Sequence, residues 1–166
     1  MMATADLTAA RLRELLNYDE LTGNFTWRHP GKKRRLDRPA GCVKALGYIV
    51  IRVDGVLLRA HRLAWLYVHG KWPALEIDHI DGNPSNNVLA NLREADSRMN
   101  KQNRHVARSD SSTGIMGVQY DKKRGLYSTR IQTPSGIKFL GRFADPLEAQ
   151  AVYLAAKRTH HAGCTI

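Results

Sequence analysis

The sequence predicts an α+β protein that is built from two parts. In residues 47–63, a β-branched run, an Asp-Gly turn and a second apolar run form the pattern of a β-hairpin. In residues 114–143, three short strand-like runs are separated by the turn sequences DKKRG and TPSG. Residues 145–163 follow with an amphipathic helical pattern, so we expect a small three-stranded antiparallel sheet plus a helix in this part.

The N-terminal elements are a helix, a strand and a basic loop. Leucines at positions 7, 12, 15 and 16 recur with a helical period, and they predict a helix over residues 4–18 with Thr4 or Asp6 as its cap. Residues 22–29 predict a short strand that follows a Gly-Asn turn. Residues 30–41 contain KKRR between Pro and Gly, which predicts a loop that is either solvated or in contact with phosphate.

The middle of the chain alternates between helical and extended patterns. Residues 61–70 predict a helix that ends at Gly70, a residue type suited to a C-cap. Residues 74–80 predict a short strand, residues 82–92 an asparagine-rich loop, and residues 94–103 a short polar helix.

A polar segment separates the two predicted parts. Residues 104–113 are small, polar and basic, which is typical of a linker. We therefore expect one domain over residues 1–103, with the N-terminal helix and basic loop attached to it, and a second over residues 114–166. In the second domain, Asp145 and Pro146 are suited to the cap and the first turn of the last helix.

The charge of the chain favours a polyanionic partner. The net charge is +11 and the pI is about 10.1. Residues 1–96 carry 14 Lys and Arg against 11 Asp and Glu, a net charge of +3, whereas residues 97–166 carry 12 against 4, a net charge of +8. Each phosphate that Lys or Arg neutralises releases condensed counterions, so nucleic acid fits this surplus. The alternative is a basic protein without such a partner.

Cysteine usage and hydropathy predict the compartment. Cys42 and Cys164 form no metal-binding or disulfide pattern, which fits a reducing cytosol. The N-terminus lacks a signal-peptide pattern, and no stretch approaches the roughly 20 apolar residues of a membrane span, so we expect no membrane partner.

The stretch EIDHIDGNPSNNVLANL, residues 76–92, contains the candidate chemistry. Adjacent residues on a strand point to opposite faces, so Asp78 and His79 are suited to two different tasks. A carboxylate binds a hard cation, and a histidine accepts a proton near neutral pH. Asn100 offers a second oxygen ligand on the predicted helix. Mg²⁺ accepts a few protein oxygens and keeps the rest of its coordination shell for water and phosphate, which is what phosphodiester hydrolysis requires.

Residues 45–105, with HRLAW and EIDHIDGNPSNNVLANLREADSRMNKQN, resemble the HNH nuclease motif of phage and intron-encoded homing endonucleases. The resemblance implies a ββα-metal (His-Me finger) fold, with His79 as the general base and Asn91 as the residue that tethers the loop and orients the base. It implies Asp78 and Asn100 as ligands of one divalent cation, Mg²⁺ or alternatively Mn²⁺. The spacing is 12 residues from His79 to Asn91 and 9 more to Asn100. It also implies products with 5′-phosphate and 3′-OH ends, formed in the cytoplasm of a bacterial or phage-infected cell.

Several residues of this region have alternative interpretations. Asp81 and three asparagines are expected to be turn residues: Asn83, Asn86 and Asn87. Asn91 could be a plain loop or cap residue, and His79 an ordinary polar strand residue. Asn103 competes with Asn100 as the ligand, although the motif spacing favours Asn100. His61 is either structural or in contact with the substrate together with Arg62, because the HRL element belongs to the resemblance.

Residues 114–160 resemble the DNA-binding domain of plant ethylene-response factors. YSTRI stands in place of WVAEI, FLGRF in place of WLGTF, and LEAQAVYLAA in place of the alanine-rich helix. The sequence departs from the family at Gln119, where arginine is usual, and at Tyr127 and Phe139, where tryptophan is usual. Phe139 and Phe143 are expected in the core. With Arg62, the candidate DNA contacts are Gln119, Tyr120, Lys122, Lys123, Arg124, Arg130, Lys138 and Arg142.

Together these patterns predict a site-directed double-stranded DNA endonuclease with one active site per chain. A monomer would nick its substrate, and a homodimer would cut both strands. The alternatives are a DNA-binding regulator with an inert nuclease domain, and a non-specific or RNA nuclease.

Overall fold

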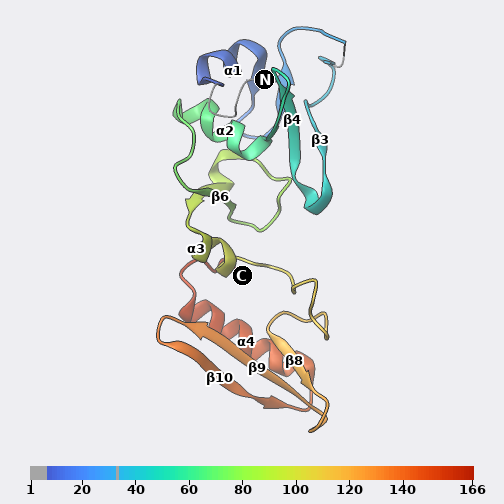
Figure 1. Ribbon diagram of the computed structural model, residues 1–166, viewed down its shortest axis with the longest axis vertical. Helices are drawn as coiled ribbons and strands as arrows, with labels where there is room; N and C mark the ends of the chain where they lie inside the picture. The colour runs from blue at the N-terminus through green and yellow to red at the C-terminus, as the bar shows by residue number, and fades with distance from the viewer. Residues whose placement is uncertain (1–6, 33) are drawn as a thin grey trace. The chain divides into compact units, whose positions relative to one another are not determined.

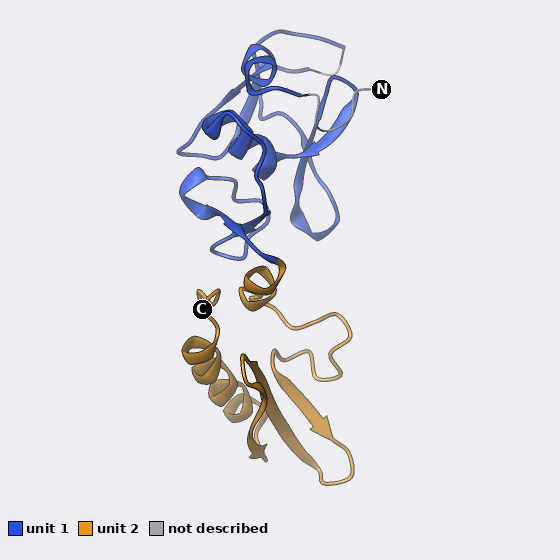
Figure 2. Ribbon diagram, turned by 60° about the vertical axis from the view of Figure 1, so that its left-hand side comes forward, with its two compact units in different colours: residues 1–96 blue, residues 97–166 orange. Residues whose placement is uncertain are grey.

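The computed structural model describes residues 7–32 and 34–166. The chain forms two compact units, residues 1–96 and residues 97–166 (Figures 1 and 2). The division falls between Asp96 and Ser97, whereas the sequence placed it after residue 103, so the short helix that follows Asp96 belongs to the second unit. The caps predicted at Thr4 and Asp6 lie outside the described residues.

The first helix is shorter than the leucine pattern predicts. Helix α1 spans Ala9–Leu15, and the Thr8 side chain caps it by accepting a hydrogen bond from the Arg11 backbone N–H at 3.1 Å. Leu16 is already extended, and strand β1 (Leu16–Tyr18) pairs antiparallel with β2 (Phe25–Trp27). The predicted helix to residue 18 is therefore wrong at its end, because Leu16 and Tyr18 are both buried with the period of two that a strand requires.

A three-stranded sheet and a helix follow next in the chain. Strands β3 (Cys42–Val43), β4 (Ile49–Val53) and β5 (Val56–Arg59) form one antiparallel sheet. The β4–β5 turn has positive φ at Asp54 (45°) and Gly55 (87°), as the predicted Asp-Gly hairpin requires. Helix α2 spans Ala60–His69 and ends at Gly70, whose left-handed conformation confirms the predicted C-cap.

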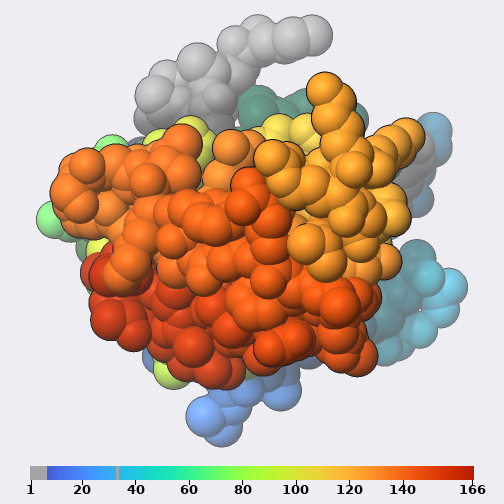
Figure 3. All heavy atoms as spheres, turned by 90° about the horizontal axis from the view of Figure 1, so that it is seen from below, coloured from blue at the N-terminus to red at the C-terminus, as the bar shows by residue number. Residues whose placement is uncertain are grey.

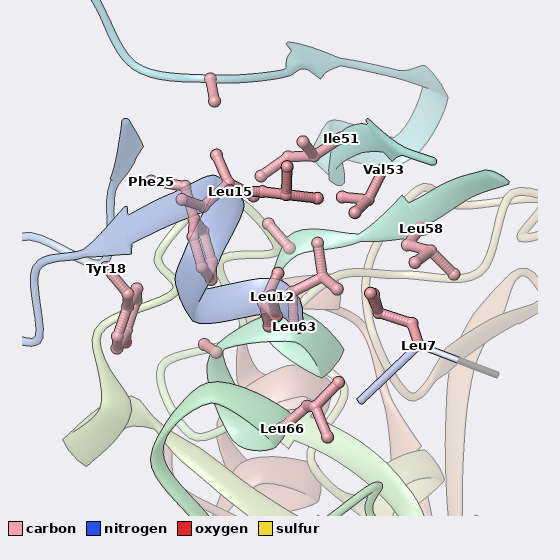
Figure 4. Close-up of a cluster of buried hydrophobic side chains, with 14 of the residues drawn as sticks. Leu7, Leu12, Leu15, Tyr18, Phe25, Ile51, Val53, Leu58, Leu63 and Leu66 are labelled. Carbon is pink, nitrogen blue, oxygen red and sulfur yellow. The ribbon is translucent and has the colours of Figure 1, made fainter. Parts of the chain in front are cut away.

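The core of the first unit lies between α1, α2 and the sheet (Figure 4). Its members share near-complete burial of apolar side chains, which supplies the main stabilisation of a domain of this size. They include Leu12, Leu16, Phe25, Ile51, Val53, Leu63 and Leu66.

Two further strands and a short helix follow in the chain. Strand β6 (Glu76–His79) pairs antiparallel with β7 (Leu92–Ala95), and the one-turn 3₁₀ helix η3 (Leu89–Asn91) precedes β7. Helix α3 spans Ser97–Gln102. The sequence assigned residues 94–103 to a helix and no strand to residues 92–95, so the structure corrects both assignments: Glu94 and Ala95 are paired strand residues.

The second unit contains a three-stranded antiparallel sheet and the longest helix. Strands β8 (Val118–Asp121), β9 (Leu126–Thr133) and β10 (Gly136–Phe143) lie in the order β10-β9-β8. Helix α4 (Pro146–His160) packs on the sheet, and the Asp145 side chain caps it by accepting from the Leu147 N–H at 2.8 Å, as predicted. In the space-filling view of Figure 3, strands of the sheet (orange) and α4 (red) form the surface of this unit that faces the viewer. No described helix combines the length and apolarity needed to cross a membrane.

Candidate active site

Strand β6 places two of the predicted site residues side by side in a buried position. Asp78 is 6% exposed and His79 is 5% exposed. The antiparallel register sets Asp78 opposite Arg93 and His79 opposite Leu92 on β7. Strand β7 was not predicted, yet it determines what the Asp78 side chain contacts.

An arginine holds the Asp78 carboxylate from the neighbouring strand. Arg93 donates to Asp78 Oδ2 through Nε at 3.0 Å and through Nη2 at 2.9 Å. The Asp78 side chain is 7% exposed and that of Arg93 26% exposed, so water screens this pair less than a surface ion pair. Arg93 is not among the residues predicted from the sequence, because its cross-strand position opposite Asp78 becomes evident only when residues 92–95 are recognised as a strand.

The His79 ring is oriented by a buried asparagine. His79 Nε2 lies 3.2 Å from Asn87 Oδ1, and Asn87 is 1% exposed. With an amide oxygen as its partner, Nε2 carries the proton and Nδ1 carries the lone pair. Burial lowers the pKa of His79, against the opposing effects of the Asn87 hydrogen bond and of the Asp81 and Asp78 charges. The imidazole is therefore neutral at neutral pH, the state in which it can accept a proton.

Tyr18 and Gly23, from the β1–β2 hairpin, contact the backbone of Asn87. The Tyr18 hydroxyl donates to the Asn87 carbonyl oxygen at 2.7 Å. Burial, with the charges of Glu20 and Asp19, raises the pKa of Tyr18 to about 12, so this donor keeps its proton. A Cβ atom on Gly23 would lie 2.4 Å from the Asn87 carbonyl carbon, so only glycine permits this approach. The sequence predicted Asn87 as a turn residue and missed its contact with His79; no local pattern distinguishes it from Asn86.

Asn91 closes the loop that follows His79. Its side-chain oxygen accepts from the Asp81 N–H at 2.9 Å, and its Nδ2 donates to Asp81 Oδ1 and to the Asn86 carbonyl oxygen, both at 2.9 Å. The Asn91 backbone oxygen accepts from the Ile80 N–H at 2.9 Å. Both ends of the loop are thereby joined through one residue.

Asp81 is the acceptor around which this loop closes. Partial burial raises its pKa, but hydrogen bonds from the Asn86 side chain, the Asn83 N–H and the Asn91 side chain outweigh that effect, and the net shift is downward. Its carboxylate accepts from Asn86 Nδ2 at 2.7 Å and from the Asn83 N–H at 2.8 Å. Asp81, Asn83 and Asn86 therefore lie in the turn, as the sequence predicts.

A second buried histidine contacts the first. His61, at the start of α2, is 3% exposed, and its ring meets that of His79 edge-on with centroids 4.9 Å apart. The Tyr48 ring lies 5.5 Å from His61 and 6.0 Å from His79, and the Arg59 guanidinium covers Tyr48 at 4.6 Å. Burial, followed by the charges of His79 and Arg59, lowers the pKa of His61 to about 3. His61 is thus a neutral packing partner of the candidate base.

The low pKa of His61 predicts acid sensitivity of the first unit. Unfolded His61 takes up a proton near pH 6.5 and folded His61 only near pH 3, so between these values the unfolded state binds more protons. The free energy of unfolding should then fall as the pH falls, by up to about 1.4 kcal/mol for each pH unit from this residue. Urea unfolding of His61→Gln at pH 7 and pH 5 should show a smaller loss than wild type. His69→Gln, an exposed control, should match wild type; identical losses in all three proteins would contradict the assignment.

The remaining predicted metal ligand and its rival lie on or after α3. Asn100 belongs to α3 in the second unit, and Asp78 belongs to the first. Asn103 is 3% exposed, and its Oδ1 accepts from the Thr165 hydroxyl at 2.6 Å and lies 3.2 Å from His105 Nε2. In the described part of the chain, no group of three or more His, Cys, Asp or Glu side chains could hold a metal. A carboxylate and an amide oxygen fit a hard cation that keeps water in its shell.

The sheet register separates the candidate DNA contacts into two faces. Gln119 and Arg142 both stand opposite Ser128, and Arg130 follows two residues later, so these three side chains share the face opposite α4, here called the outward face. Tyr120 and Lys138 have the other parity, and the Tyr120 ring lies 5.0 Å from that of Tyr127.

The other candidate contacts lie at a turn and on α2. Lys122, Lys123 and Arg124 form the β8–β9 turn, where Arg124 pairs with Asp121 at 2.9 Å. Arg62 lies on α2, with its guanidinium 5.7 Å from the centre of the Trp72 ring.

The core position predicted for Phe139 is wrong. Its side chain is 53% exposed and pairs in register with Arg130, so it belongs to the outward face. The bulge between Phe139 and Gly141 shifts the register there, and the Arg142 guanidinium lies 5.0 Å from the Phe139 ring. Phe143, the other predicted core residue, is only partly buried.

Three comparisons relate this chain to known proteins. A family model described as HNH endonuclease matches residues 58–102, a range that contains Asp78, His79, Asn91 and Asn100. Protein 3.8 of Escherichia phage T7 is 35% identical over 104 residues, which cover 62% of this chain and 84% of the phage protein. A solved structure entitled DNA binding and cleavage by the HNH homing endonuclease I-HmuI aligns with 90% of this chain and 88% of its own, with 20% identity and a TM-score of 0.42.

Proposed function

This chain belongs to the HNH endonuclease family, and we propose that it is a site-directed DNA endonuclease of the homing type. The observation that carries the proposal is the arrangement around His79: a buried imidazole of lowered pKa, with Nε2 at 3.2 Å from Asn87 Oδ1. A neutral, oriented histidine beside a carboxylate is what hydrolysis of a phosphodiester by an activated water requires.

In the proposed reaction, His79 takes the proton from the attacking water. Asn87 keeps the ring in one tautomer and one orientation through Nε2, so the second ring nitrogen is the base. Asn91 acts as a positioning residue, because its bonds to Asp81 and Asn86 hold the loop that follows the base. Loss of that loop geometry would misdirect the proton transfer without removing the base itself.

Asp78 and Asn100 are the proposed ligands of one divalent cation, in a ββα-metal arrangement of β6, β7 and α3. Arg93 orients the Asp78 carboxylate, and α3 begins at Ser97, separated from the end of β7 by Asp96 alone. Mg²⁺ fits this oxygen donor set, with Mn²⁺ as the alternative. When bound, the cation would stabilise the charge that develops on the phosphate and on the 3′ oxygen.

The outward face of the second unit is the proposed source of most of the DNA affinity. Arg130, Arg142 and Gln119 lie on it, and residues 97–166 carry a net charge of +8. Their position supports contact with the phosphate backbone and, for Gln119 and the arginines, with base edges. One active site per chain implies nicking by a monomer or double-strand cleavage by a homodimer.

A plasmid assay tests the proposed reaction. Supercoiled plasmid carrying the DNA that flanks the gene should become nicked or linear with Mg²⁺ and stay intact with excess chelator, because without a cation the negative charge that develops on the phosphate and the 3′ oxygen is not stabilised. Labelled single-stranded DNA and RNA should be cut less than duplex DNA. Duplex binding without cleavage would favour a regulator with an inert nuclease domain, and preferential cutting of RNA would favour an RNA nuclease.

A further inference from the structure

The second unit contains a hollow of about 650 Å³ that the proposed reaction does not use. It lies between the segment that joins α3 to β8, the strands β8 and β9, and the C-terminal half of α4. Ile115, Met116 and Tyr153 contribute apolar wall, and Asp110 is the single acidic residue among the described residues that line the hollow. The hollow therefore has the composition of a site for an anion that carries an organic group.

The cations around the hollow exceed the negative charge available to them. Asp110 is already neutralised by Arg108, whose Nε and Nη2 donate to its carboxylate at 2.8 and 2.9 Å. Four further cations line the hollow: Lys101, Arg104, Arg130 and Lys157. None of these four forms an ion pair with a residue in the described part of the chain. The lining thus carries an excess of positive charge.

Lys157 is the most informative of these residues because it is only 2% exposed. Its ammonium group donates to the Arg104 carbonyl oxygen and lies 3.8 Å from the Met116 sulfur, and both of these acceptors are uncharged. Burial lowers the pKa of Lys157. A buried ammonium group is costly without a counter-charge, so an anion in the hollow would relieve that cost.

The hollow borders the outward face of the sheet. Gln119 and Arg130 are among the residues that line the hollow, and the sheet register also places both of them on the outward face. A polyanionic strand that lies on the outward face can therefore reach the hollow at the edge formed by β8. Lys157 also joins α4 to the linker through its hydrogen bond to the Arg104 carbonyl oxygen. That structural role alone would not require the other cations that line the hollow.

We propose that this hollow binds a backbone phosphate of the DNA strand that lies along the outward face, with Lys157 and Arg104 as its principal ligands. This inference rests on the proposed DNA binding, and it adds a contact that lies apart from the exposed residues of the sheet. The linker segment that contains Arg104 becomes part of the DNA interface rather than a connection between two functional parts.

Salt-dependent binding by the full chain tests the inference. Binding to a short labelled duplex is measured by fluorescence anisotropy in chelator over a range of salt concentrations. Arg104→Gln and Lys157→Gln should each weaken binding several-fold and reduce the slope of log K against log salt by about 1, as expected for the loss of one phosphate contact. Arg158→Gln removes one charge from the neighbouring position of α4 without lining the hollow, and it should leave the slope nearly unchanged.

Circular dichroism and calorimetry distinguish a loss of DNA contact from misfolding and from binding of a free anion. Circular dichroism establishes that each variant is folded, and the exposed Arg104 side chain provides a test that does not disturb the buried Lys157. Calorimetric titration with pyrophosphate and with a 5′-mononucleotide distinguishes a free phosphate from a DNA phosphate. Tight binding of either small anion, lost in both variants while the duplex slope stays as in wild type, would overturn the DNA assignment. The DNA assignment would also be overturned if Arg104→Gln, Lys157→Gln and Arg158→Gln all gave the same slope of log K against log salt. Failure of wild-type cleavage with normal duplex binding would instead contradict the proposed nuclease function alone.

Discussion

Replacing His79 with alanine should reduce plasmid cleavage by at least about 10²-fold, because a positioned general base typically contributes that much. The expectation follows from the neutral, buried ring and its contact with Asn87. Binding to the duplex should remain, because the proposed DNA contacts are mostly in the second unit. Cleavage is measured as the rate of supercoiled plasmid loss in Mg²⁺, and binding by anisotropy in chelator.

Two control variants separate a chemical from a structural effect. His69→Ala makes the same truncation at an exposed histidine on α2, and it should cleave as wild type does. His79→Gln keeps a polar side chain of similar length in the buried site and should be folded yet inactive. Cleavage by folded His79→Gln at the wild-type rate would refute the base assignment.

Local chemistry explains which elements were predictable from the sequence. The Asp54-Gly55 turn and the Asp145-Pro146 helix start each combine a residue type with a backbone requirement, and both are present in the structure. Gly70 at the end of α2 belongs to the same class, since it adopts a positive φ of 75°. In these cases the signal and the structure lie within a few residues of each other.

The elements that sequence analysis missed depend on distant partners. Residues 92–95, LREA, lack the β-branched alternation of a strand, and they become β7 because β6 pairs with them. Leu16 leaves the helical pattern for the same reason, since β2 offers it a partner in Trp27. Tertiary pairing outweighed local helix propensity at both positions.

Some residues of the candidate site could likewise be predicted from local sequence, and others could not. The spacing of Asp78, His79 and Asn91 is visible in the sequence, and the structure sets these residues on β6 and at the loop end beside it. Arg93 and Asn87 were not identified, because the first acts across strands and the second resembles its neighbouring turn asparagines. Residues that position other residues carry no pattern of their own, and contacts reveal them.

Replacing Asn91 with alanine should affect stability and cleavage together. The change removes three side-chain hydrogen bonds, two to Asp81 and one to Asn86, while the backbone bond to Ile80 remains. At about 1 kcal/mol for each bond, discounted for partial exposure, the free energy of unfolding should fall by about 1–3 kcal/mol. Urea unfolding measures the loss, and cleavage measured well below the transition should fall by at least about tenfold because the loop no longer holds the base in position.

Asn83→Ala is the matched control in the same loop. Within the described residues, its side chain makes one hydrogen bond, accepting from the Ser85 N–H at 3.1 Å, and the residue is exposed. We therefore expect a loss below about 1 kcal/mol and near-normal cleavage. If Asn91→Ala were destabilised to the expected extent but cleaved as Asn83→Ala does, Asn91 would be a loop residue without a role in positioning His79. A large loss of cleavage with little loss of stability would instead place Asn91 closer to the reaction than its present contacts with Asp81 and Asn86 imply.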